Sequence, residues 1–448
     1  MSSEWASLTI GDLVHHGEAS VQTGPFGSQL HSHDYIDNGT PVIPTEAIGR
    51  GRILDIAVPR VGSIKAMELS RHRLRLGDIL FARRGAQAPG LSAIVDQRFE
   101  GALCGTGALL LRIQSPRVDP NYLAMFLSSD ISYRWLRAHA VGAVMPNLNT
   151  EIIKACPLTL PSLDEQRSLA RFVGAVDDRI ALLRETNATL EAIAQALFKS
   201  WFVDFEPVRA KQQGLASAGM DEATAALFPD SFEESALGLV PKGWQVETID
   251  DLCDVITNGG TPSRSNAAFW TSGTMPWFKT GDFADGFLLD PVERISEAAI
   301  SGSSVKVLPA NAILMAIYAA PTVGRLGVLT EAATFNQACT GMVAKASVGP
   351  WYLFLTLFFG RAWFNSRANG AAQQNISKAI VASYQAVVAS ASLMARFHEI
   401  ADGLYSRIRA NSEQTQTLAT LRDTLLPRLI SGQLRLPDIQ PLVAETMA

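Results

Sequence analysis

The sequence predicts an α/β (α+β) fold in which one type of domain and one type of long helix each occur twice. Two observations indicate this: an unbroken heptad pattern from Pro161 to Phe205, and a gapless match of that stretch to residues 228 positions further on. A third is that short motifs upstream of the first stretch recur upstream of the second. The expected chain order is therefore domain, helix, domain, helix.

Residues 1–158 and 241–388 are expected to be the two copies of the domain. Trp5 matches Trp244 at an offset of 239, and GDILFARRG with CGTG is matched to NAILMAIYA with ACTG at an offset of 234. An offset that shrinks along the chain is typical of copies that diverged through loop insertions and deletions. Short β-rich runs, separated by turns and followed by a helix, favour an α/β or α+β domain. The remaining segments are a linker of mixed order and a C-terminal tail: residues 207–240 and 435–448.

A first spacer helix is expected over residues 159–206. Its apolar residues alternate between spacings of four and three, and this period of 3.5 favours a partner helix over a broad core. Ser162 and Glu165 form the pattern of a capping box at its start. The seam positions are Leu169, Val173, Val176, Ile180, Leu183, Asn187, Leu190, Ala194, Leu197 and Trp201.

A second spacer helix is expected over residues 389–434. It repeats the seam of the first helix, so the two helices are predicted to form a coiled coil with each other. Asn187 and Asn411 fall in the seams, where buried polar groups can fix the register at some cost in stability. Pro427 predicts that the second helix kinks or ends near Leu426.

The composition excludes several classes of protein. A chain of 448 residues with 47% hydrophobic and 18% charged residues is typical of a soluble protein of two or three domains. The four cysteines are far apart and form no CxxC motif, which favours a reducing compartment and no cysteine-built metal site. The N-terminus lacks a signal-peptide pattern, and the apolar run near residues 351–364 is too short to span a bilayer. We expect a cytoplasmic protein with no membrane partner.

Several longer motifs resemble the specificity (S) subunit of type I restriction-modification systems. They are PSLDEQR and ALFKSWFVDFEPVRAK around the first helix, LGLVPKGW and TNGGTPS at the start of the second domain, and LRDTLLPRLISGQL at the end of the second helix. The first domain lacks the PKGW form. The resemblance implies two target-recognition domains separated by two antiparallel coiled-coil helices, which together form a pseudo-two-fold internal repeat.

The resemblance also implies a non-catalytic DNA-recognition subunit. Its partners would be double-stranded DNA, two methyltransferase subunits and two restriction (translocase) subunits. No cofactor is expected in this chain: S-adenosylmethionine would belong to the methyltransferase partner, and ATP and Mg to the restriction partner. Because the two domains differ in sequence, the DNA site should be bipartite and non-palindromic.

Polar residues on loops are the candidates for DNA contact. Base-edge readout requires exposed hydrogen-bonding side chains, and guanidinium with guanine is the most common such pair. A solvated loop is an equal alternative for each of these residues. The candidates are Arg83, Arg84 and Gln87 in the first domain, and Tyr318, Thr322, Arg325, Lys279, Thr280 and Asp282 in the second.

Charge favours DNA binding only in the first domain. Between Arg50 and Arg98, ten Lys or Arg residues accompany four acidic residues, a net charge of +6, whereas the whole chain carries −5. A protein that binds DNA unaided is usually basic. We therefore expect the partner subunits to supply much of the phosphate contact.

The end of the first helix is crowded with aromatic residues that a two-helix seam is too narrow to cover. Such a cluster predicts an exposed patch that binds the methyltransferase subunits. The expected partner-binding residues are Phe198, Trp201, Phe202 and Phe205.

Catalytic motifs are weak, and two other functions stay open. Asp119 to Tyr122 resembles the DPPY box of amino-methyltransferases, but Asp119 as N-cap before Pro120 is a sufficient structural reason for the motif. The sequence contains no Walker A motif. The alternatives are a self-contained DNA methyltransferase or nuclease, which would need a cofactor or metal site, and a non-DNA coiled-coil scaffold, which would leave the duplicated polar loops unexplained.

Overall fold

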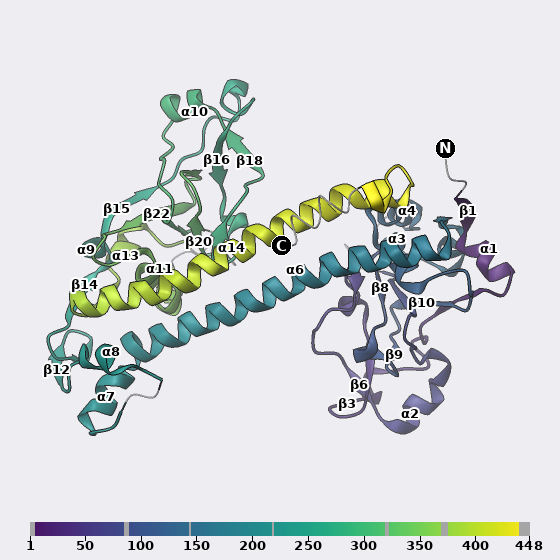
Figure 1. The fold of residues 1–448 in the computed structure, drawn as a ribbon, viewed down its shortest axis with the longest axis horizontal. Helices are drawn as coiled ribbons and strands as arrows, with labels where there is room; N and C mark the ends of the chain where they lie inside the picture. Colours follow the sequence, from purple (N-terminus) through teal and green to yellow (C-terminus); the bar gives the residue numbers. More distant parts are fainter. Residues whose placement is uncertain are drawn as a thin grey trace. The chain divides into compact units, whose positions relative to one another are not determined.

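The chain divides into two compact units in the computed structural model. One contains residues 1–181 and 416–448, and the other contains residues 182–415. Each unit holds one α/β half and a segment of each long helix, drawn in teal and yellow in Figure 1. No helix in the described part of the chain is long and apolar enough to cross a membrane. The structure describes residues 5–84, 89–142, 145–216, 219–318, 322–368 and 375–438.

The first half is built on a five-stranded sheet in the order β2-β10-β7-β8-β5, with a four-stranded sheet β3-β6-β4-β9 and a pair β1-β11 beside it. Its strands are β1 (Ala6–Thr9), β2 (Ala19–Thr23), β3 (Tyr35–Ile36), β4 (Thr40–Ile43), β5 (Gly51–Arg52), β6 (Arg60–Val61), β7 (Ile79–Ala82), β8 (Ser92–Ile94), β9 (Leu103–Cys104), β10 (Ala108–Ile113) and β11 (Pro157–Leu160). Its helices are α1 (Ile10–His15), α2 (Ser63–Glu68), α3 (Pro120–Ser128), α4 (Asp130–His139) and α5 (Thr150–Ala155).

The larger sheet of this half is buried on both faces. Along β7 every residue is buried, and the side chains alternate between two hydrophobic cores. Ile79 and Phe81 join the core that includes α3, whereas Leu80 and Ala82 join the core that includes Ile43 of β4. The alternation follows from the two-residue period of a strand. The uninterrupted apolar run ILFA fits the place of β7 in the middle of the five-stranded sheet.

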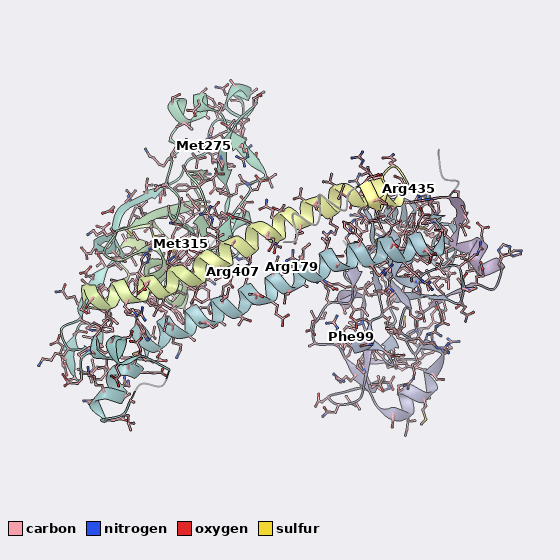
Figure 2. The ribbon with its side chains drawn as sticks, viewed as in Figure 1. Phe99, Arg179, Met275, Met315, Arg407 and Arg435 are labelled. Atoms are coloured by element: carbon pink, nitrogen blue, oxygen red, sulfur yellow. The ribbon has the colours of Figure 1, made fainter. Side chains whose placement is uncertain are left out.

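The second half repeats this plan with sheets β15-β22-β19-β20-β17 and β18-β16-β21 and a pair β14-β23. Its strands are β14 (Gln245–Thr248), β15 (Cys253–Asn258), β16 (Met275–Phe278), β17 (Gly286–Leu288), β18 (Glu293–Ile295), β19 (Ile313–Ala316), β20 (Leu326–Leu329), β21 (Thr334–Phe335), β22 (Cys339–Ala344) and β23 (Gln385–Val388). Its helices are α9 (Ile249–Leu252), α10 (Glu297–Gly302), α11 (Pro350–Phe359), α12 (Arg361–Ser366) and α13 (Lys378–Ala382). Met315 of the central strand β19 is labelled in Figure 2.

Equivalent hydrogen bonds align the two halves and correct one detail of the sequence match. The N–H of Gly24 donates to the carbonyl of Ala108 at 2.9 Å, and that of Gly259 donates to Cys339 at 3.1 Å. Ala108 is therefore equivalent to Cys339, so β10 and β22 align at an offset of 231. The match of CGTG to ACTG at 234 is wrong by three residues. The two short motifs look alike, but an indel between β7 and β10 shifts the register, and only the ladder hydrogen bonds reveal it.

The two long helices are α6 (Leu163–Phe198) and α14 (Ala391–Ile430). The capping box at the start of α6 is confirmed: Glu165 N donates to Ser162 Oγ, and Ser162 N donates to the Glu165 carboxylate, each at 3.3 Å. Within each unit the two helix segments run antiparallel. In the first unit Asp177 pairs with Arg422 at 2.5 Å, and Glu165 pairs with Arg435, which lies beyond the end of α14 (Figure 2).

Pro427 does not end the second helix. The prediction of an end near Leu426 is therefore wrong, since α14 continues through Pro427 to Ile430. A proline removes one N–H, and this position is within one turn of the end of the helix. Leu429 and Ile430 are each 1% exposed in the core of the first unit. Their burial holds the last turn in place despite the missing hydrogen bond.

Between the halves the chain forms α7 (Glu206–Gln212), α8 (Glu222–Ala226) and a hairpin of β12 (Phe232–Ser235) with β13 (Gly238–Pro241). Residues 217 and 218 lie outside the described part. Phe228 and Phe232 of this segment pack against the core of the second unit. The segment therefore extends that core, and the expected division of the chain at residues 206 and 240 stays a prediction.

Candidate nucleic-acid interface

Four backbone segments meet at one end of the large sheet in the first half. Where β7 ends, Arg83 N donates to the carbonyl of Gly107 at 3.0 Å, and Leu148 N donates to the carbonyl of Arg83 at 2.9 Å. Gly24, after β2, donates to Ala108 beside Gly107 at 2.9 Å. We call this meeting point, formed by the backbone around residues 24, 83, 107 and 148, the loop junction. The predicted Arg83 lies at this junction, and Arg84 follows it directly.

The second half has the same loop junction. Ile317 N donates to the carbonyl of Ala338, and Ile376 N donates to the carbonyl of Ile317, both at 2.9 Å. Arg84 forms an antiparallel bridge with Asn147, and Tyr318 forms the equivalent bridge with Asn375. Two of the predicted contact residues, Arg84 and Tyr318, therefore occupy corresponding positions.

Both loop junctions require glycine at one point because the backbones approach closely. A Cβ atom on Gly24 would lie 1.9 Å from the carbonyl oxygen of Gly105. A Cβ atom on Gly259 would lie 2.3 Å from the carbonyl oxygen of Asn336, the residue equivalent to Gly105. These distances are far below van der Waals contact, so the glycine is a packing requirement in both halves.

The predicted residues of the first half differ in their surroundings. Arg83 is half-buried, and its Nε donates to Asn147 Oδ1 at 3.1 Å and to the carbonyl of Leu148 at 3.2 Å. Arg84 is exposed. Gln87 lies outside the described residues. Arg83 is therefore fixed in place, whereas Arg84 extends into solvent.

In the loop after β19, Tyr318 is 39% exposed. Thr322 Oγ1 donates to the carbonyl of Tyr318 at 3.1 Å, and Arg325 N donates to the carbonyl of Thr322 at 2.9 Å. The side chain of Arg325 is half-buried. Residues 319–321 lie outside the described part. These contacts bring Tyr318, Thr322 and Arg325 together on one loop.

The other predicted group of the second half has structural contacts of its own. Asp282 accepts a hydrogen bond from Lys279 N at 2.8 Å, which caps the 3₁₀ turn Thr280–Asp282. Lys279 Nζ pairs with Glu293 at 2.8 Å, and Glu293 also pairs with Arg264. Arg264 and then Lys279 lower the pKa of Glu293 to about 2. Lys279 and Asp282 are thus engaged within the fold, and Thr280 is half-buried.

Two residues that the sequence did not single out stand beside the loop junctions. Thr106 lies in the turn before β10, and the exposed Gln337 occupies the corresponding turn before β22. Thr261 Oγ1 donates to Gln337 Oε1. The signal was present in CGTG, whose two glycines predict a turn, and this turn connects β9 of the smaller sheet to β10 of the larger one. Both turns lie beside the loop that follows the central strand, since Arg83 N donates to the carbonyl of Gly107 and Ile317 N donates to that of Ala338.

Ion pairs offset part of the positive charge of the basic segment of the first half, residues 50–98. Arg50 pairs with Asp130 at 2.5 Å, and Lys65 lies 3.4 Å from Asp34, so two acids from outside the segment offset its charge. Arg98 pairs with Asp96 at 2.7 Å. Exposed ion pairs of this kind contribute little stability, but they reduce the local positive potential.

The aromatic residues at the end of α6 do not form the expected exposed patch. Phe198, Trp201, Phe202 and Phe205 are 3%, 3%, 5% and 8% exposed, and they belong to the core of the second unit. Phe198 and Phe202 pack on Phe397 with ring centroids 5.9 and 5.0 Å apart. The remaining rings around the four are Phe228, Phe232, Trp244, Tyr352 and Phe359. The expectation of an exposed partner surface is wrong. The segment after α6 and the second half cover the aromatic rings that the two helices alone would leave exposed.

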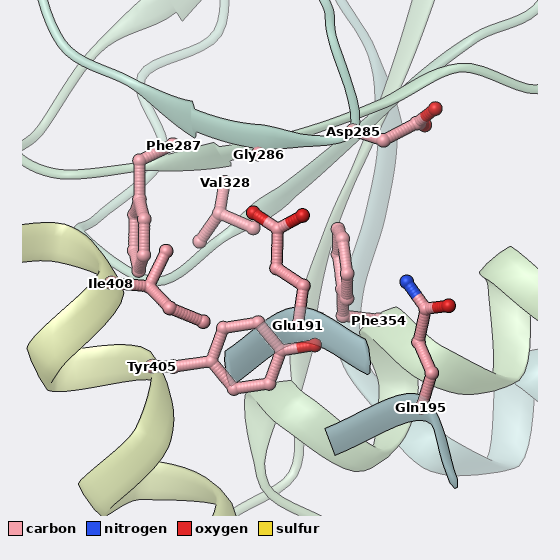
Figure 3. Close-up of a pocket in the computed structure, with 9 residues that line it drawn as sticks. All are labelled: Glu191, Gln195, Asp285, Gly286, Phe287, Val328, Phe354, Tyr405 and Ile408. Carbon is pink, nitrogen blue, oxygen red and sulfur yellow. The ribbon is translucent and has the colours of Figure 1, made fainter. Parts of the chain in front are cut away.

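A small pocket lies where the helices meet the second half (Figure 3). Its lining includes Glu191 of α6, Asp285 before β17 and Tyr405 of α14. Burial raises the pKa of Glu191, and the nearby Asp285 raises it further. Asp285 itself pairs with Arg361 and accepts a hydrogen bond from Leu326 N at 2.9 Å. The pocket has room for about one water molecule, so it suits a packing defect better than a ligand site.

The residues that resemble a DPPY box serve the fold. Asp119 Oδ1 accepts from the N–H groups of Asn121 and Tyr122, both at 3.0 Å. The buried Tyr122 donates its hydroxyl to the carbonyl of Thr159 at 2.8 Å. The residues described here contain no cluster of three His, Cys, Asp or Glu side chains that could hold a metal ion.

The chain matches the family model described as "Type I restriction modification DNA specificity domain" over residues 3–192 and 241–387. The HindI specificity subunit of Haemophilus influenzae is 25% identical over 96% of this chain and 100% of that protein. The MjaIX specificity subunit of Methanocaldococcus jannaschii is 21% identical over 72% of this chain and 71% of that protein. The crystal structure of the S subunit from M. genitalium superposes with a TM-score of 0.57 at 15% identity, covering 95% of this chain and 96% of that chain. The two matched regions together make up most of the sequence, and the chain belongs to the type I restriction-modification DNA specificity family.

Proposed function

We propose that this specificity subunit directs its complex to a bipartite, non-palindromic DNA site, with each α/β half reading one part of that site. A specificity subunit is the non-catalytic subunit of a type I system. The proposal rests chiefly on one observation. The two halves share the loop junction bond for bond, yet they carry different side chains there, such as Arg84 in one and Tyr318 in the other.

A loop junction with the same backbone but different side chains is what two related DNA-recognition domains with different target sequences require. The backbone of each junction is fixed by paired hydrogen bonds, and exposed side chains project from it. Direct readout depends on the donors and acceptors of such side chains, so unlike residues at corresponding positions select unlike base pairs. On this view Arg83, Arg84 and Gln87 act in the first half, and Lys279, Thr280, Asp282, Tyr318, Thr322 and Arg325 act in the second.

The chemistry of the complex would lie in its partners. Two methyltransferase subunits would bind S-adenosylmethionine, and two restriction subunits would use ATP and Mg in the cytoplasm. Because Phe198, Trp201, Phe202 and Phe205 are core residues, the exposed faces of α6 and α14 would form the partner surface. Leu182 and Ile193 of α6 are large apolar residues that are 53% and 48% exposed.

Mapping of methylated positions tests the proposal. Genomic DNA from a host that carries the partner subunits should be compared with and without this gene. We expect methylation at a motif of two unlike parts separated by unread base pairs, and only when the gene is present. A single continuous motif, a palindrome, or methylation independent of the gene would contradict the proposal.

A further inference from the structure

Arg83 is held through both its backbone and its side chain. Its N–H donates to Gly107, and its carbonyl accepts from Leu148, at 3.0 and 2.9 Å. Its Nε donates to Asn147 Oδ1 at 3.1 Å and to the carbonyl of Leu148 at 3.2 Å. Both the backbone and one edge of the guanidinium group are therefore fixed.

The opposite edge of the same group carries the two terminal nitrogens. A guanidinium group is planar, so a hydrogen-bonded Nε also sets the plane in which the two Nη groups lie. The described residues offer these Nη groups no hydrogen bond. What Arg83 presents is a pair of parallel N–H groups in a set direction, and this arrangement matches two acceptors side by side.

The second half retains the frame but lacks the arginine. Ile317, which is 1% exposed, stands in the place of Arg83, and Asn375 stands in the place of Asn147. Asn375 Oδ1 is buried and has no hydrogen-bond partner among the described residues. The acceptor that orients the guanidinium group is therefore present in both halves, whereas the group itself is present only in the first.

We infer that Arg83 is a DNA-contact residue that binds a pair of adjacent acceptors on DNA, and that Asn147 is its positioning residue. This rests on the proposed function, which makes the first half a reader of one half-site. The acceptor pair is either O6 and N7 of a guanine or two oxygens of one phosphate, since both match the fork. Ile317, at the corresponding position of the second half, has no side-chain donor for such a contact.

The test uses the reconstituted complex of this chain with its methyltransferase subunits. Methylation is measured on DNA libraries in which the first half-site is randomised, over a series of salt concentrations. If Arg83 binds guanine, Arg83→Gln should reduce the preference for one base pair by about 10- to 100-fold and leave the other positions unchanged. If it binds phosphate, Arg83→Gln should weaken all sequences equally and lower the salt slope by about one. A variant that alters neither the preference nor the salt slope would overturn the inference.

Replacement of the guanine by 7-deazaguanine separates the two acceptor pairs directly. In the guanine case the wild-type complex should lose its preference with 7-deazaguanine, and Arg83→Gln should lose nothing further. Should Arg83→Gln fail to fold, Arg83→Lys keeps the charge but removes the planar fork. The same single-position loss is then expected for guanine, and for phosphate a uniform weakening with an unchanged salt slope.

The positioning role of Asn147 has its own readout. Asn147→Ala should relax the same base pair or phosphate contact as Arg83→Gln, whereas Asn147→Asp keeps the acceptor for Nε and should retain it. Asn121→Ala, at an exposed position of α3, is the matched control. Equal behaviour of the Ala and Asp variants of Asn147 would overturn the positioning role. An intact preference together with an unchanged salt slope in Arg83→Gln, in a protein whose half-site still changes when residues 1–158 are exchanged, would refute this inference alone.

Discussion

Asn411 of α14 donates a hydrogen bond from Nδ2 to Oδ1 of Asn187 of α6 at 2.8 Å, inside the seam between the helices. Asn187 in turn donates to the carbonyl of Ile408 at 3.1 Å and to Ser412 Oγ at 3.0 Å. Asn411 is 2% exposed. The polar groups of this pair are satisfied in one register of the two helix segments, so the pair selects that register.

Removal of one partner should be more harmful than removal of both. Asn411→Leu leaves the half-buried Asn187 Oδ1 without its donor, and we expect the free energy of unfolding to fall by about 1–3 kcal/mol. The double variant Asn187→Leu with Asn411→Leu should recover most of this loss, because an apolar seam needs no hydrogen bonds. Urea denaturation of the purified single and double variants measures both free energies of unfolding. A single variant as stable as the wild type would show that the Asn187–Asn411 pair does not select the register.

Glu191 should make the stability of the second unit depend on pH. Burial and the nearby Asp285 raise the pKa of Glu191 in the folded state above its ordinary value of 4.5. The folded state then holds the proton of Glu191 more tightly than the unfolded state does, so protonation of Glu191 stabilises the fold. This stabilisation is complete at pH values below the ordinary pKa and is lost as the pH rises through the raised pKa. Glu191→Gln should therefore raise the melting temperature at pH 7 and leave it nearly unchanged at pH 4. Equal shifts at both pH values would contradict this origin.

The aromatic cluster at the end of α6 should act through stability. Trp201→Ala removes a ring that is 3% exposed, which should lower the free energy of unfolding by about 3–5 kcal/mol. Val203→Ala, two residues away and 44% exposed, should change it by about 0.5 kcal/mol or less. Thermal denaturation before any assembly assay distinguishes loss of folding from loss of a partner surface. A stably folded Trp201→Ala protein that fails to bind the methyltransferase subunits would revive the partner role.

Glycine at the loop junction should be indispensable. Gly24→Ala places a methyl group 1.9 Å from the Gly105 oxygen, so the backbone must shift, and we expect a loss of about 1–3 kcal/mol. Gly27→Ala is the matched control, since nothing lies within 4 Å of its new Cβ atom. Differential scanning calorimetry of the two variants checks the contrast, and equal melting temperatures would contradict the tight approach.

The heptad pattern made much of the fold predictable. Leu169, Val173 and Val176 are 4%, 5% and 1% exposed, as the seam requires. A period of 3.5 is a local property, so it can be read directly from the residues. The short β-rich runs that became β7 and β19 likewise favoured an α/β or α+β domain.

What the sequence left hidden depends on contacts between distant segments. The burial of Phe198 and Trp201 comes from residues more than 20 positions further along the chain, such as Phe228 and Phe397. The hydrogen bond that orients the Arg83 guanidinium group requires Asn147, which is 64 residues away. The offset of Ala108 from Cys339 is visible only in the ladder hydrogen bonds. Local patterns predict elements well, whereas the surroundings of a side chain follow from the tertiary fold.

Exchange of the first domain tests the central claim most directly. Residues 1–158 should be replaced by the equivalent domain of a relative with a different target, and the methylated motif should be mapped with the same methyltransferase subunits. Because each half is proposed to read its own part of the site, we predict that one half-site changes to that of the donor protein and the other stays the same. A change in both half-sites, or in neither, would contradict the claim that the two halves read DNA separately.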